Sequence, residues 1–181
     1  MKKRALILTI FLHAVFLMLV YIFQGIIFPF MRINGLVPLM LPVAVTGIAL
    51  YEGQYTGGVA GLFAGILCDV SFNQPVGVFT VVLTFSGLLV GTLADSVVLR
   101  GFVTYYISCA AVLVMCAFIQ IFSLTISLVS AEQVVPTQAM ISTMIQQTIF
   151  SLLLAFPIWF FVRALGKYSE RFLPMGRSAQ S

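Results

Sequence analysis

The sequence predicts an all-α integral membrane protein, a compact bundle of about six transmembrane helices in one polytopic domain spanning residues 1–181. Hydrophobic residues make up 61% of the chain and charged residues only 8%, and the mean hydropathy is +1.15. A soluble domain carries about 25% charged residues. Because one span needs roughly 20 apolar residues, a chain of 181 residues has room for at most about seven spans joined by short loops.

Charges and Gly/Pro positions divide the apolar sequence into six runs. The second run is short and contains Pro38 and Pro42, so we expect it to begin as a broken turn. The fifth run is long, and we expect it to tilt in the bilayer. The expected helices are about 5–30, 36–51, 54–71, 76–98, 102–129 and 138–163.

The basic residues predict the orientation. With the amino terminus inside, only Arg32 lies outside, and cytoplasmic loops are the ones enriched in Lys and Arg. We therefore expect a multi-pass membrane protein with both termini in the cytoplasm. Basic residues at chain ends do not form the patch that a nucleic-acid partner needs. The residues placed inside are Lys2, Lys3, Arg4, Arg100, Arg163, Lys167, Arg171 and Arg177.

The third expected helix carries glycine at every fourth position. Small residues at this spacing let two helix backbones approach closely in lipid. The stripe packs the third and fourth helices against each other or against the rest of the bundle, or it forms a docking groove for a partner helix. Both can hold, because a helix has two flanks. The candidate interface is Gly57, Gly61, Gly65, Asp69 and Gly77, and a second small-residue stripe on the fourth helix is Gly87 and Gly91.

Asp69 ends the first stripe and is the acid that most needs an explanation. An ionised Asp costs about 2.5–3.5 kcal/mol at the bilayer centre and less near the interface. Three interpretations stay open: a carboxylate capped by backbone N–H groups of the turn at 73–77, a contact to a partner, and an ion site. The other charges, Glu52, Asp95, Arg100 and Glu132, are expected to be solvated at headgroup level.

Catalytic residues are not apparent in the sequence. His13 stands alone without a second ligand at metal spacing, so we expect a buried, hydrogen-bonded histidine. No nucleophile has an attendant base, and no phosphate-binding loop is present. The sequence thus favours a protein that is not an enzyme and has no cofactor or metal.

The middle of the chain resembles the MreD family of rod shape-determining proteins. The family signature is a glycine-rich third helix ending in Gly-Leu-Leu-x-Asp and followed by Pro-Leu-Gly. Here Ile66 and Val76 depart from it while staying apolar, and the resemblance is best over residues 36–98. The matching positions are Gly65, Leu67, Asp69, Pro75 and Gly77.

This resemblance implies a non-enzymatic scaffold of the cell-elongation complex in the bacterial plasma membrane. Its partners are then an MreC-like single-pass membrane protein, other proteins of that complex and the lipid bilayer. The implied role is to support side-wall peptidoglycan synthesis and rod cell shape.

An alternative is the substrate-binding subunit of an energy-coupling-factor vitamin transporter, which has similar size and a similar arrangement of six helices. Such subunits carry an Ala-x-x-x-Ala stripe on the first helix, whereas Ala5 and Ala14 are nine residues apart here. They also surround an outer pocket with polar groups. The sequence offers few there, namely Asp69, Asn73, Gln74 and Glu132.

Overall fold

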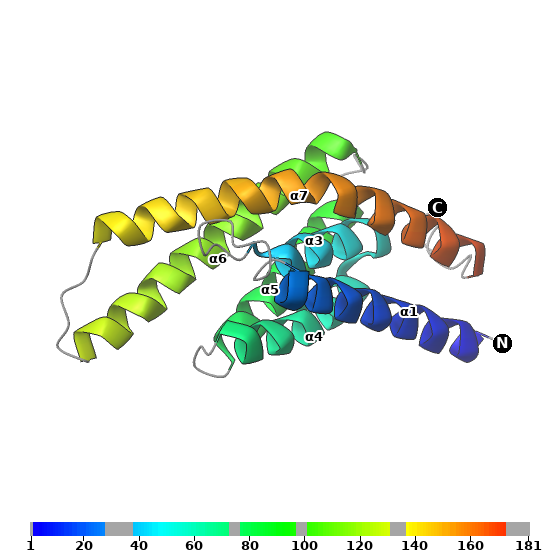
Figure 1. Cartoon of the computed structure of the whole chain (residues 1–181). Coiled ribbons are helices and arrows are strands. Elements are labelled where there is room, and N and C mark those ends of the chain that lie inside the picture. The colour runs from blue at the N-terminus through cyan, green and yellow to red at the C-terminus, as the bar shows by residue number, and fades with distance from the viewer. Residues whose placement is uncertain (1, 28–37, 73–76, 97–100, 131–136, 173–181) are drawn as a thin grey trace.

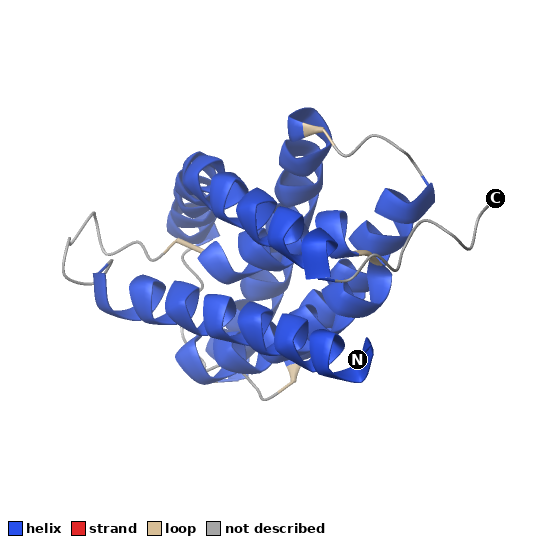
Figure 2. Ribbon diagram, turned by 90° about the vertical axis from the view of Figure 1, so that its right-hand side faces the viewer, coloured by secondary structure: helices blue, strands red, loops and turns tan. Residues whose placement is uncertain are grey.

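A computed structural model describes residues 2–27, 38–72, 77–96, 101–130 and 137–172. Within these ranges all regular elements are helices and no strand occurs (Figure 2). The elements are α1 (Lys2–Ile22), the π-helical turn η1 (Phe23–Ile27), α3 (Met40–Glu52), α4 (Gln54–Phe72), α5 (Val78–Ser96), α6 (Phe102–Ser130) and α7 (Thr137–Phe172).

Six α-helices therefore occur in the described part of the chain, in the expected order, and two of their bounds differ clearly from expectation. The second helix begins at Met40 rather than 36, with Pro42 in its first turn, where the missing N–H has no intrahelical acceptor to lose. The last helix continues to Phe172 instead of ending near 163, and Pro157 lies inside it. A proline inside a helix does not end it when neighbouring helices support the backbone.

The central element is α3, whose residues from Met40 to Leu50 are all buried. It packs against α1, α4, α5, α6 and α7, and Figure 1 shows it enclosed by them. A helix that is apolar on every side must be buried on every side. The other helices are thus arranged around α3.

The first turn of α3 receives hydrogen-bond acceptors from two distant parts of the chain. The Met40 and Leu41 amides donate to Oε1 of Gln24 at 3.0 and 3.3 Å. The Leu39 amide donates to Oγ of Ser151 at 2.8 Å. Helix amino termini leave amides without intrahelical acceptors, and in an apolar environment such amides need other partners. Gln24, in η1, and Ser151, in α7, supply them.

Two helices are long and apolar enough to cross a membrane by length and composition, Phe102–Ser123 within α6 and Ile141–Gly166 within α7. Three shorter apolar stretches accompany them in the described residues: Ile10–Ile26, Met40–Glu52 and Val78–Ala94. In Figure 1, α6 and α7 extend to the left beyond α3, α4 and α5. The bundle thus combines a short-helix core with one long helical hairpin.

Candidate functional site

Helices α4 and α5 approach each other backbone to backbone at the glycine stripe. A Cβ added at Gly61 would meet the carbonyl group of Leu83 and Cα of Thr84, and one added at Gly65 would meet the backbone of Thr80. All these contacts would be closer than 3.0 Å, which real Cβ atoms essentially never show. Only glycine fits at these two positions without moving a helix.

The glycines of α5 complete the same interface from the other side. A Cβ at Gly87 would meet the carbonyl group of Gly57, and one at Gly91 would meet the backbone of Gln54. Gly57 also faces α3, because its added Cβ would lie 2.8 Å from Cα of Ala49. Both predicted stripes therefore lie in one interface, with α3 closing it at Gly57.

Of the two interpretations of the stripe, this geometry fits packing within the bundle. Gly57, Gly61 and Gly65 face α5 and α3 of their own chain, which leaves no room there for a partner helix. The large side chains of α4 that point away from the bundle are Tyr55, Val59, Leu62, Phe63, Ile66 and Val70. A partner helix that contacts α4 has to meet this outward face.

The Asp69 carboxylate caps the amino terminus of α5. Its Oδ2 accepts hydrogen bonds from the Gly77 amide at 2.9 Å, the Thr80 amide at 3.2 Å and the Thr80 hydroxyl at 2.6 Å. Its Oδ1 accepts one from the Phe79 amide at 2.8 Å. A negative charge is favourable at this end of a helix. Asp69 is 5% exposed, and both oxygens are engaged, as the capping interpretation requires.

The donors to Asp69 differ in part from those expected. The expected turn at 73–77 contributes the Gly77 amide, and residues 73–76 lie outside the described residues. Phe79 and Thr80 belong to the first turn of α5, which sequence reasoning missed as a donor group. The missed signal was that a helix amino terminus follows Asp69 closely, and its unpaired amides need an acceptor.

Gly77 serves the cap through its backbone conformation. Its φ is +106°, a region that residues with a side chain rarely adopt. A Cβ there would meet nothing within 4 Å, so the constraint is conformational and not steric. Gly77 thus belongs to the candidate interface for a different reason from Gly61 and Gly65.

The structure corrects the expectation that Glu52 is solvated at headgroup level, because its side chain is largely buried. Its Oε1 lies 3.8 Å from Nε2 of His13, and the two side chains are only 13% and 5% exposed. The pair joins α1 to the carboxyl end of α3, far from Gln24 at the other end of α3. Of the other charges expected at headgroup level, the Asp95 side chain, Arg100 and Glu132 lie outside the described residues.

In the described ranges, no cluster of three or more His, Cys, Asp or Glu side chains is placed to hold a metal ion. The chain's three cysteines, Cys68, Cys109 and Cys116, are free and buried. The polar side chains described above instead connect helices.

Comparison with known protein families gives a match that covers most of the chain. The family model for "rod shape-determining protein MreD" matches residues 4–168. No curated protein and no solved structure matches the chain. The matched range begins in α1 and ends in α7, so it includes the glycine interface and the Asp69 cap. The chain belongs to the MreD family of rod shape-determining proteins.

Proposed function

We propose that this protein is a non-enzymatic scaffold of the cell-elongation complex, which binds an MreC-like single-pass membrane protein and supports side-wall peptidoglycan synthesis and rod shape. The observation that carries the proposal is the family match over residues 4–168. Members of this family are membrane-associated and take part in rod shape determination. The apolar helices of this chain agree with that location.

The contacts that polar side chains make between helices support a scaffold function. Gln24 and Ser151 cap α3, Asp69 caps α5, and Glu52 lies beside His13 of α1. Each contact fixes one helix relative to another. Side chains engaged in this way stabilise a shape that a partner can recognise, which is what a scaffold has to provide.

We further propose a multi-pass topology with both termini in the cytoplasm. The distribution of Lys and Arg supports it. So does the arrangement in Figure 1, where the first turn of α1 and the last turn of α7 lie at the same end of the bundle. Reporters fused at Met1 and Ser181 should both report the cytoplasm, and one inserted at 131–136 should report the outside. An external carboxy terminus would overturn this topology.

The partner is tested by purifying the tagged protein from the native membrane in mild detergent. Recovery of a single-pass membrane protein in stoichiometric amount, with loss of rod shape when this chain is depleted, is the expected result. Recovery of nucleotide-binding subunits would instead identify the transporter subunit. Gly61→Leu serves as a control, because capture per folded molecule should stay unchanged if the partner uses an outward face.

A further inference from the structure

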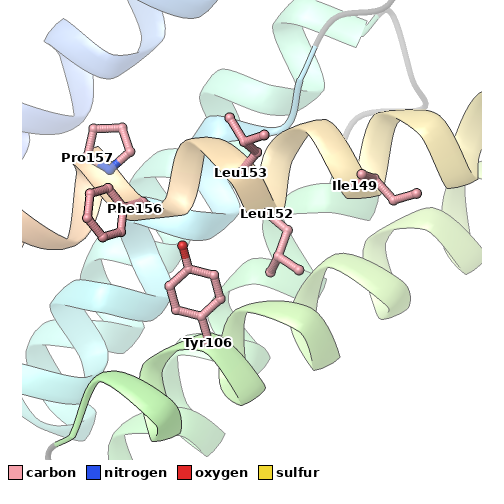
Figure 3. A pocket seen from close by; sticks show the side chains of 6 residues that line it. All are labelled: Tyr106, Ile149, Leu152, Leu153, Phe156 and Pro157. Carbon is pink, nitrogen blue, oxygen red and sulfur yellow. The ribbon is translucent and has the colours of Figure 1, made fainter.

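An open apolar groove of about 570 Å³ lies between α6 and α7. Figure 3 shows Tyr106 of α6 with its hydroxyl group directed toward α7, where Leu152 and Phe156 lie on either side. The groove is on the outside of the bundle, because Ile149, Leu153 and Phe156 are 62%, 66% and 51% exposed. The residues that line it are Tyr106, Ile149, Leu152, Leu153, Phe156 and Pro157.

Aromatic rings surround one end of this groove. The Phe102 ring centroid is 4.6 Å from that of Tyr106, 6.1 Å from that of Phe156 and 5.2 Å from that of Trp159. Beyond them, the Arg163 guanidinium carbon lies 5.0 Å from the centroid of the Trp159 ring. Tryptophan and tyrosine gather at the level where a membrane meets water. The groove thus leads from an apolar surface to an aromatic and cationic end.

Arg163 is on the same face of α7 as the groove. Ile149, Leu153, Phe156, Phe160 and Arg163 follow one another at spacings of three and four residues, which places them along one side of a helix. Arg163 is exposed. At 1.5 Å per residue, its backbone lies about 10 Å beyond Phe156 along the axis. This distance separates the apolar residues that line the groove from the positive charge of Arg163.

A second donor beside Arg163 has no acceptor. Trp159 Nε1 is buried and makes no hydrogen bond in the described structure. Buried donors without an acceptor are rare and call for an explanation. Because this nitrogen is enclosed, an oxygen-rich group bound next to Arg163 would reach it only after the indole turns.

We propose that this groove binds an anionic phospholipid, with an acyl chain along Leu152, Leu153 and Phe156 and the phosphate at Arg163 beside the Trp159 indole. An apolar partner helix would fill the groove but would leave the exposed Arg163 cation without an anion. A molecule with an apolar chain and an anionic head matches both parts. The site goes beyond the proposed scaffold function and would select lipids by headgroup charge.

The chain contains a single tryptophan, and it stands in the site, so its fluorescence reports occupancy directly. The full chain is placed in vesicles of phosphatidylcholine containing a fixed fraction of brominated phosphatidylglycerol or brominated phosphatidylcholine. The brominated phosphatidylglycerol should occupy the site about fivefold better, the effect expected for one basic residue near the surface. Raising NaCl to a high concentration should reduce this preference.

Substitutions of Arg163 and Arg177 distinguish lipid binding at this site from a general effect of the protein's net charge. Arg163→Gln should remove the preference for phosphatidylglycerol, while Arg177→Gln, which removes the same charge elsewhere, should keep it. Arg163→Lys should keep a preference that depends on salt. Equal quenching by the two lipids in the wild type, a preference insensitive to salt, or a preference kept by Arg163→Gln would each overturn the proposal. Quenching by neither lipid would show that a protein helix covers the groove and would also overturn it.

Discussion

The α4–α5 contact makes a quantitative prediction for Gly61→Ala. The added methyl group would overlap the Leu83 carbonyl group and Cα of Thr84, and these backbone atoms cannot rotate away. The two helices must separate by on the order of 1 Å, which forfeits roughly a quarter to a half of the van der Waals attraction of the affected contacts. Overpacking of this kind costs about 1–3 kcal/mol.

The neighbouring Gly58 provides a matched control on the same helix. A Cβ at Gly58 would meet only the side chain of Leu88, the nearest atom being Cδ2 at 2.7 Å, and that end of the side chain can move. Alanine also gains about 1 kcal/mol over glycine in a helix interior. Gly58→Ala should therefore be neutral or slightly stabilising, while Gly61→Ala should be clearly destabilising.

Both variants are measured by thermal unfolding in one detergent with a fluorogenic thiol reagent. The three cysteines are buried and react as the bundle opens. For a domain of this size 1 kcal/mol corresponds to roughly 2–4 °C, so Gly61→Ala should unfold about 2–12 °C below Gly58→Ala, which shares the gain of alanine over glycine. If the two variants unfolded at the same temperature, the backbone contact at Gly61 would not be a determinant of stability, and the interface described here would be refuted.

Further substitutions test the polar contacts and the backbone conformation of Gly77. Asp69→Leu should destabilise more than Asp69→Asn, because Leu leaves the amides of α5 without acceptors at about 1–3 kcal/mol each, and equal melting temperatures would contradict the cap. Gln24→Leu should speed hydrogen exchange at the Met40 and Leu41 amides, which mass spectrometry can follow, and unchanged exchange would count against that contact. Gly77→Ala should cost roughly 1 kcal/mol through its positive φ, whereas Gly101→Ala, where a Cβ also meets nothing within 4 Å, should cost less.

The glycine stripes show how far sequence reasoning reaches in a membrane protein. Their spacing predicted a close approach of helix backbones at Gly61 and Gly65, and the structure has one. The spacing did not indicate which helix makes the approach, because packing in lipid uses the same small residues within a chain and between chains. The identity of the neighbour became clear only from the α5 backbone lying against these glycines.

The polar contacts were harder to foresee. The turn after Asp69 suggested a local cap, and part of it was predicted because the donors are close in sequence. Gln24 and Ser151 reach α3 from segments far away in the chain, and nothing in their local sequence distinguishes them from other polar residues in apolar helices. Glu52 was misplaced for the same reason, since its burial depends on α1 lying beside the end of α3.

The short length of α3 and its hydrogen bond to Ser151 have a consequence for how the protein is made in the membrane. With 13 residues the helix is only about 20 Å long, shorter than the roughly 30 Å of hydrocarbon that a lone span must cross. Its first turn is completed by Ser151, which leaves the ribosome more than a hundred residues after Leu39. The central helix therefore reaches its final environment only when α7 has been made. Nascent chains that stop before α7 should remain substrates for membrane quality control, however well their earlier helices insert.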